Sequence, residues 1–287
     1  MMHVLATLVV LSFTLPVAAQ ELLATQPARR PTTRPGEVSV EIIIDSSQVP
    51  ELADWCEKDL RPVLEKWYPL IVADLPSNGF TPPPKFTVVI DPSYGGVAAT
   101  SSTRVMVSPV WIKQQMVRLP WNEAIGSVVH EEVHVVQQYG YGSRRGGTPN
   151  PVWLVEGIAD YIRWFKYEPE DKRPHPNPIV RVAAAGGGGR RGRGRGAQTQ
   201  PTTPGAQTQP ATRAAQAPPT TRPANYTDSY RTTAAFLNYV ADKHDHEIVV
   251  KLNASLRDGR YRPELWSLYT GKTVEELWAE YYETLKR

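Results

Sequence analysis

Two histidines and a glutamate stand at a spacing that can hold a catalytic metal ion. In the run HEEVH at residues 130–134, His130 and His134 are four residues apart, so on a helix they share one face. Two imidazoles placed in this way can bind one Zn²⁺ ion, and Glu131 can reach the metal-bound water as a general base. A helix with two partly buried histidines and no metal is the alternative interpretation of the same residues.

A catalytic zinc site needs a third protein ligand and one open position. The run WLVEGIADY at residues 153–161 supplies Glu156, 22 positions after His134, and Asp160 one helical turn further on the same face. This spacing predicts Glu156 as the third ligand and Asp160 as the acceptor of a hydrogen bond from a ligating histidine. An acidic, solvated helix face is the alternative, but the flanking apolar residues favour burial, where unpaired carboxylates are costly.

Three segments resemble the plant and bacterial basic secretory protein family. They are HEEVHVVQQYG at residues 130–140, PVWLVEGIADYIRW at 151–164, and a C-terminal pattern that begins with SYRTTAAFLNYV at 229–240. Members of this family are regarded as secreted, gluzincin-like zinc peptidases. The resemblance therefore implies a zincin-like fold and a peptide or protein substrate. The resemblance also implies the roles of the site residues. His130, His134 and Glu156 would be the metal ligands, Glu131 the general base, and Asp160 the hydrogen-bond acceptor of a ligating histidine.

The resemblance also implies a donor for the oxyanion that develops during peptide hydrolysis. Gluzincins commonly take a tyrosine or histidine from a later segment, and Tyr230 resembles the matching tyrosine, with Tyr226 and His244 as alternatives. Residues 95–101 are expected to form a sheet edge to which an extended peptide can add as a further strand.

The elements that must position these residues follow from the apolar periodicity. Alternating residues predict strands at 38–45, 86–90 and 103–107, with an edge strand at 97–100, and helical spacing predicts a helix of about six turns from Leu52 to Val72. Further helices are predicted at 109–115, 121–139, 152–166, 229–243, 247–257 and 273–286, the last opened by a capping box of Thr273 and Glu276. Strands followed by helices predict an α+β domain over residues 37–287. A small N-terminal sheet with one long helix is expected first, and then a mainly helical C-terminal half that carries the metal site.

An insertion rich in Arg, Gly, Pro and Gln interrupts this domain at about residues 169–224. It contains nine Lys or Arg and two Asp or Glu, so the formal net charge of +3 for the 287-residue chain originates here. Its composition cannot bury a core, which predicts a disordered loop between two helices. The Arg-Gly run at 190–196 has no aromatic residue on which bases could stack, so no nucleic-acid partner is expected.

The N-terminus predicts export. An uncharged apolar run at residues 4–17 leads into Val-Ala-Ala at 17–19, which indicates a signal peptide at 1–19, with a retained lipophilic anchor as the alternative. A Pro-, Thr- and Arg-rich linker is expected at 20–36. No later segment is long and apolar enough to span a membrane, and the single cysteine, Cys56, excludes an internal disulfide and a cysteine-rich zinc module. A secreted or periplasmic location follows.

These observations together predict a secreted zinc-dependent metallopeptidase that uses a metal-activated water with Glu131 as general base. The first alternative is a non-catalytic secreted binding or defence-type protein that keeps the zincin fold. The second is a surface-tethering module that works through its basic insertion. The glutamate beside two ligands favours the enzyme, because a binding module has little need of it.

Overall fold

The computed structural model describes residues 38–118, 123–139, 149–182 and 220–287. The predicted signal peptide at 1–19 and linker at 20–36 lie outside the described residues. Among the described residues, no helix is both long enough and apolar enough to cross a membrane.

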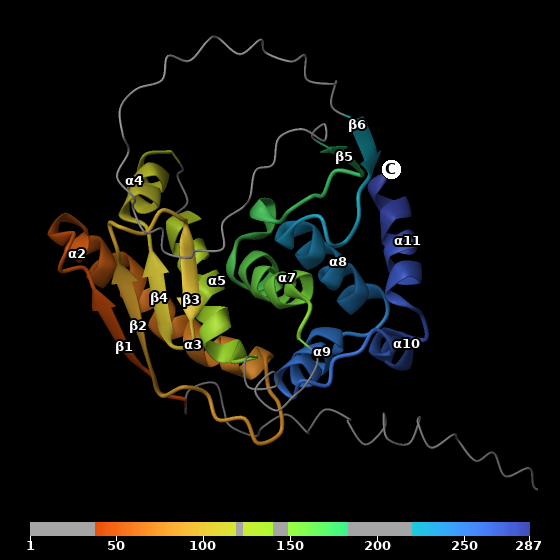
Figure 1. Cartoon of the computed structure of the whole chain (residues 1–287), viewed down its shortest axis with the longest axis horizontal. Helices are drawn as coiled ribbons and strands as arrows, with labels where there is room; N and C mark the ends of the chain where they lie inside the picture. The colour runs from red at the N-terminus through yellow and green to blue at the C-terminus, as the bar shows by residue number, and fades with distance from the viewer. Residues whose placement is uncertain (1–37, 119–122, 140–148, 183–219) are drawn as a thin grey trace, which may run out of the picture.

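A four-stranded sheet forms one side of the N-terminal half (Figure 1). Its strands are β1 (Glu41–Asp45), β2 (Lys85–Ile90), β3 (Ala98–Ser101) and β4 (Arg104–Val107). The order is β1-β2-β4-β3, with the first three parallel and β3 antiparallel to β4. The predicted strands are confirmed, and β3 occupies the expected edge.

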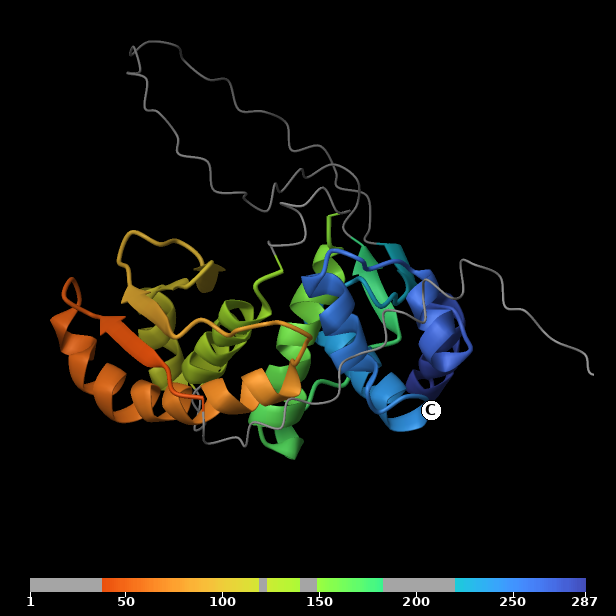
Figure 2. The same cartoon turned by 90° about the horizontal axis from the view of Figure 1, so that it is seen from below.

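The long helix predicted after β1 is broken into successive helical segments. A short 3-10 turn (Pro50–Leu52) leads through α2 (Ala53–Trp55) and a π-helical segment (Cys56–Leu60) into α3 (Arg61–Asp74). Its apolar face is fully buried, because Leu60, Leu64, Tyr68 and Ile71 are inaccessible to solvent. Figure 2 shows this helical run along one side of the molecule, with the C-terminal helices at the other end.

The helices that follow the sheet build the rest of the domain. They are α4 (Pro109–Arg118), α5 (Glu123–Gln137), α7 (Val152–Ile162), α8 (Tyr230–Lys243), α9 (Ile248–Arg257), α10 (Glu264–Thr270) and α11 (Val274–Leu285). The capping box of Thr273 and Glu276 is present at the start of α11. The sequence analysis omitted α10, a helix of seven residues that is too short to show a helical period. The mixed class, with a small sheet followed by a helical half, is confirmed.

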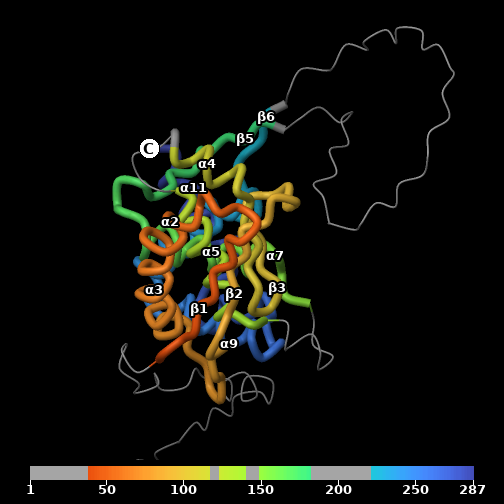
Figure 3. Tube along the Cα trace, turned by 90° about the vertical axis from the view of Figure 1, so that its left-hand side faces the viewer, coloured from red at the N-terminus to blue at the C-terminus, as the bar shows by residue number. Residues whose placement is uncertain are grey.

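Helix α5 is the central element of the fold. It contacts α3, β3 and β4 on one side and α7 on another, and nearly all of its side chains are buried. Figure 3, which looks along the sheet from its β1 side, shows α2 and α3 beside the strands and α5 behind them. Any acidic side chain on α5 must therefore be paired, neutralised by burial or open to a cleft.

Helices α7 and α8 approach each other closely at one glycine. A Cβ atom built on Gly157 would lie 2.2 Å from Cγ2 of Thr233. Two non-bonded carbon atoms cannot approach so closely, so only glycine fits at this position. This close approach places the first turn of α8 beside α7.

Arg257 on α9 joins the C-terminal ends of two earlier helices. Its guanidinium donates to the carbonyl oxygens of Val136 and Gln137 at the end of α5 and to the carbonyl oxygen of Leu75 after α3. The last carbonyls of a helix have no partner within it, so one side chain satisfies groups from both helices. Burial lowers the pKa of Arg257 to about 10, and the side chain stays charged at neutral pH.

Both ends of the predicted insertion contain regular secondary structure. A 3-10 turn (Glu170–Lys172) and a hairpin of β5 (Ile179–Val182) and β6 (Thr220–Pro223) occupy its two ends, and Ala224 is buried. The prediction of disorder across 169–224 is therefore wrong at both ends, where backbone pairing compensates for weak apolar patterning. The central part, residues 183–219, lies outside the described residues.

The hairpin suggests a clean deletion. Val182 and Thr220 are paired residues of β5 and β6, and a two-residue Asn-Gly turn can join such a pair. We expect replacement of 183–219 by Asn-Gly to leave the unfolding midpoint within about 4 °C of wild type, a shift that corresponds to roughly 1 kcal/mol or less. The reason is that these residues include no Val, Ile, Leu, Met, Phe, Tyr or Trp and contribute no large apolar side chain to a core.

Thermal unfolding followed by circular dichroism measures this effect. A variant in which 183–219 is scrambled in order but kept at full length is the control for length. Loss of cooperative unfolding in the deletion, with the scrambled control unaffected, would contradict this domain assignment.

Candidate metal centre

Three potential metal ligands converge between α5 and α7. The Nε2 atoms of His130 and His134 lie 3.2 Å apart, and Oε2 of Glu156 lies 3.2 Å from the first and 3.4 Å from the second. These three residues form a group that could hold a metal ion, because the ligand atoms that they offer all lie within 4.8 Å of one another. The helical spacing on α5 and the next helix thus brings together the three residues that the sequence analysis named.

Hydrogen bonds behind the histidines fix which ring nitrogens point at one another. Nδ1 of His130 lies 2.7 Å from Oδ1 of Asp160, and Nδ1 of His134 lies 2.7 Å from Oε1 of Gln137. The amide of Gln137 is oriented by its own donation to the carbonyl oxygen of Val155, so Oε1 is the acceptor and Nδ1 the donor. With both Nδ1 atoms as donors, the neutral imidazoles present their Nε2 lone pairs to each other and to Glu156.

Lone pairs that face one another call for a cation between them. Burial disfavours the charged form of His130, but the carboxylates of Asp160 and Glu156 outweigh it and raise the pKa of that imidazole to about 10. Burial also opposes the charge of Glu156, yet hydrogen bonds from His130 and His134 hold the pKa of its carboxyl well below the usual range. The cluster therefore retains a proton at neutral pH unless a metal ion replaces it.

The geometry fits a tetrahedral metal ion. Ligands about 2.0 Å from a tetrahedral centre lie about 3.3 Å from one another, and the three ligand atoms are 3.2 to 3.4 Å apart. Two imidazoles and one carboxylate match the ligand preference of zinc. His130, His134 and Glu156 could hold such an ion with one position left for water or substrate.

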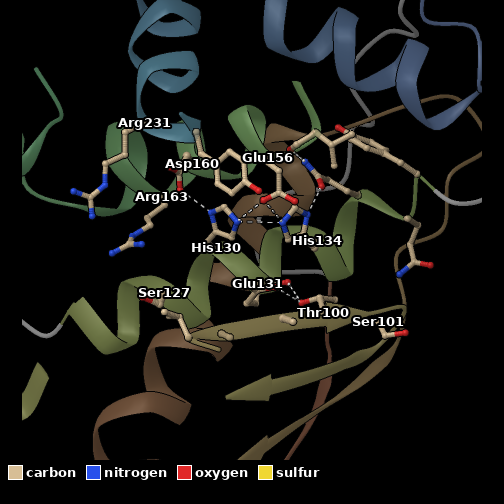
Figure 4. A pocket seen from close by; sticks show the side chains of 18 of the residues that line it. Thr100, Ser101, Ser127, His130, Glu131, His134, Glu156, Asp160, Arg163 and Arg231 are labelled. Carbon is tan, nitrogen blue, oxygen red and sulfur yellow. Dashed lines mark hydrogen bonds and ion pairs between the residues drawn. The ribbon is translucent and has the colours of Figure 1, made fainter. Parts of the chain in front are cut away.

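Of the two consecutive glutamates, only Glu131 faces the cleft. Its Oε2 accepts a hydrogen bond of 2.8 Å from the hydroxyl of Thr100 on β3 (Figure 4). Glu132 is completely buried, and within the described part of the chain neither of its carboxylate oxygens has a hydrogen-bond partner. Burial raises the pKa of Glu132 well above its ordinary value, so this side chain is neutral and unsuited to act as a base.

A cleft of about 1050 Å³ opens over these residues. Its walls are β3, the exposed side of α5, the side of α7 that carries Glu156, and the start of α8. Tyr230, the first residue of α8, lines it with its ring centroid 6.4 Å from that of His130 and the two planes 20° apart. The residue is 46% exposed, so it is accessible to a ligand in the cleft.

The alternatives to Tyr230 lie elsewhere. Tyr226 packs against Trp153 and Phe236 and donates to Glu275. Nε2 of His244 is 3.1 Å from Oε2 of Glu280 on α11. Neither residue lines the cleft, so among the three candidates only Tyr230 is placed beside the metal ligands.

Gln137 and Thr100 are site residues that the sequence did not predict. Gln137 follows His134 by three residues, and this helical spacing is the signal that could have indicated it. Thr100 comes from an edge strand that lies 31 residues before Glu131, and no local pattern connects the two.

Neither a curated protein nor a solved structure matches the chain. A family model described as peptidase of plants and bacteria matches residues 52–176 and 208–281. The match includes His130, His134 and Glu156 and leaves out 177–207, which lie within the predicted insertion. Because more than half of the sequence is matched, the chain belongs to this family of peptidases of plants and bacteria.

Proposed function

We propose that this protein is a zinc-dependent metallopeptidase with a zincin-like fold. The observation that carries the proposal is the convergence of His130 Nε2, His134 Nε2 and Glu156 Oε2 at tetrahedral spacing in an open cleft. Membership of a peptidase family supports peptide bonds as the substrate. A bound zinc ion would polarise the carbonyl to be attacked and lower the pKa of a water molecule.

The residues of the chain supply the other parts of the reaction. Glu131 lies on the same helix as His130 and faces the cleft, where its carboxylate can accept a proton from the attacking water and pass it to the leaving amine. Tyr230 stands at the cleft edge, where its hydroxyl can donate to the oxygen that becomes negative. Asp160 and Gln137 hold the two imidazoles in the tautomer that ligation requires.

The edge strand supports a peptide substrate. β3 pairs with β4 on one side, and residues 97–102 line the cleft along its length. In the described part of the chain no strand pairs with the other side of β3. An extended peptide can add there by backbone hydrogen bonds, which would bring a peptide carbonyl past Glu131.

Export remains part of the proposal. The apolar run at residues 4–17 and the small residues that follow it support cleavage by a signal peptidase and a secreted or periplasmic location.

The first prediction concerns metal content. We expect about one zinc ion per purified chain, measured by inductively coupled plasma mass spectrometry after dialysis. The double variant His130→Ala/His134→Ala should contain almost none, because one carboxylate alone binds zinc weakly. His175→Ala/His246→Ala is the matched control, since both of these histidines are exposed. Equal zinc in wild type and the His130/His134 variant would place the metal elsewhere.

The second prediction concerns the base. Glu131→Gln should keep its zinc and its fold but hydrolyse a peptide library at least 100-fold more slowly, because an amide cannot accept the proton. Glu132→Gln is the control, since a neutral buried carboxyl resembles an amide. Full activity in zinc-loaded Glu131→Gln would refute this mechanism. Absence of hydrolysis in the wild type on every peptide tested would instead favour a non-catalytic binding protein.

The third prediction concerns Thr100, whose hydroxyl is 2.8 Å from the Glu131 carboxylate. Thr100→Val should lower kcat about tenfold, as expected when a hydrogen bond to a charged group is lost, while zinc content and KM stay near wild type. Thr100→Ser keeps the hydroxyl and should restore most of kcat. If Thr100→Val and Thr100→Ser have the same kcat, the hydroxyl does not orient the base.

A further inference from the structure

Two arginines line the cleft beside the metal ligands. On α5, Glu123, Ser127 and His130 follow one another at helical spacing, and the same holds for Glu156, Asp160 and Arg163 on and just after α7. Each of these rows runs along its helix from the metal ligands to the same end of the cleft. At a rise of 1.5 Å per residue, that end lies about 10 Å from the metal ligands. Arg231, in the first turn of α8, reaches this end as well, and Figure 4 shows both guanidiniums on the His130 side of the ligand group.

Arg163 is buried but makes little use of its donors. Its side chain is only 9% exposed, although a guanidinium offers five N–H groups. Among the described residues its side chain has one hydrogen bond, a long one of 3.4 Å from Nη2 to Oε1 of Glu123. Oε1 of Glu168 lies 3.7 Å from its Nε, and Nε itself has no hydrogen bond within the described chain. A charged group that is nine-tenths buried and lines a cleft has capacity for a further acceptor.

The position of Arg163 is fixed from behind. A Cβ atom on Gly126 would lie 2.2 Å from Oε1 of Glu168 and 3.1 Å from Nε of Arg163, so this glycine lets the ion pair pack directly against α5. The guanidinium also lies 4.3 Å from the ring centroid of Trp164. The side chain is therefore held in place before any ligand binds.

Arg231 completes the pair. Its Nη2 donates to the same Oε1 atom of Glu123 at 2.9 Å, and its guanidinium lies 4.4 Å from the Trp164 ring centroid. Its side chain is 54% exposed. One carboxylate oxygen and one indole ring thus hold both guanidiniums together.

Two of the acids near the arginines do not face the cleft. Glu123 and Glu168 balance the two arginines in number, but neither belongs to the described residues that line the cleft, whereas Arg163, Arg231 and Ser127 do. Asp160 also lines the cleft and interacts electrostatically with Arg163, but its carboxylate is already paired with Nδ1 of His130 at 2.7 Å. The Ser127 hydroxyl donates to the carbonyl oxygen of Glu123, so a substrate that enters this end meets the donors of the two guanidiniums. Paired guanidiniums recognise carboxylates well, because they can form several charge-assisted hydrogen bonds to one group.

We propose that Arg163 and Arg231 form a carboxylate-binding subsite, so that the preferred ligands of the cleft are peptides with a carboxylate a few residues from the bond held at the metal centre. The separation of about 10 Å along the helices corresponds to roughly three residues of extended peptide, or fewer if a side chain bridges part of the distance. The carboxylate can come from an Asp or Glu side chain or from a free C-terminus. The proposal rests on the proposed peptidase function and identifies the substrate class of that site.

The test compares carboxylates with their amides. We would measure Kd by fluorescence anisotropy for zinc-loaded, full-length Glu131→Gln with labelled hexapeptides in pairs. One series changes Glu to Gln at each position in turn, and a second changes the free C-terminus to the amide. We expect one pair in one series to show about tenfold tighter binding of the carboxylate, as for one charge-assisted hydrogen bond. The series that responds identifies the source of the carboxylate.

Arginine variants connect this preference to the subsite. In the same Glu131→Gln background, Arg231→Gln should reduce the carboxylate-to-amide ratio of Kd towards one, and Arg231→Lys should keep part of it because the charge remains. Arg260→Gln removes the same charge from an exposed position outside the cleft and should leave the ratio unchanged. Arg163→Lys, which retains a buried charge, tests the second guanidinium where Arg163→Gln fails to fold.

The outcomes separate this inference from the peptidase proposal. Equal Kd values for every pair, or a preference that survives unchanged in both Arg231→Gln and Arg163→Lys, would overturn the subsite. If the subsite is overturned in this way but the wild-type protein hydrolyses the peptides, the proposed peptidase function still holds. Conversely, an arginine-dependent preference in a wild-type protein that cleaves none of the peptides would support the subsite and refute the peptidase.

Discussion

The site depends on one electrostatic constraint: lone pairs that face one another repel unless a proton or a metal ion lies between them. His130 and His134 direct their Nε2 lone pairs at each other across 3.2 Å, and the Glu156 carboxylate closes the triangle. The hydrogen bonds of Asp160 and Gln137 to the opposite ring nitrogens prevent either imidazole from turning away. Because these groups come from both α5 and α7, a metal ion bound at their centre would also join the two helices. Metal binding would in this way be linked to the packing of the domain core.

The buried position of α5 explains how the fold treats its charges. A helix with nearly all side chains buried can carry acids only where each is paired, neutral or open to a cleft. Glu131 faces the cleft and accepts from Thr100, and Glu132, on the other side of the same turn, is neutral through burial. Two adjacent glutamates thus differ in chemistry because the helix rotates by about 100° between them.

The sequence predicted most of the site residues that share a helical period, with Gln137 as an exception, and missed those that meet only through tertiary packing. His130, His134, Glu156 and Asp160 could be named because spacing along a helix fixes which side chains share a face. Thr100 and Arg231 could not, because a strand and the start of α8 converge on the cleft from separate parts of the chain. Arg163 shares the helical period of Glu156 and Asp160, but its pairing with Arg231 depends on tertiary packing. The hairpin of β5 and β6 was missed for a related reason. Its strands flank a long polar segment, and their pairing depends on backbone groups that carry no sequence signature.

That hairpin also explains how the cleft around the metal ligands can be built across an insertion. Tyr230 and Arg231 reach the cleft from α8, which packs on α7 through Gly157 and Thr233, yet residues 183–219 separate the two helices in sequence. β5 and β6 pair up to Val182 and Thr220, which holds the two ends of that segment about 5 Å apart. The free energy of closing a loop grows only slowly with its length once the ends are fixed. The length of the insertion can therefore change without moving α8 relative to α7, and the cleft keeps its shape.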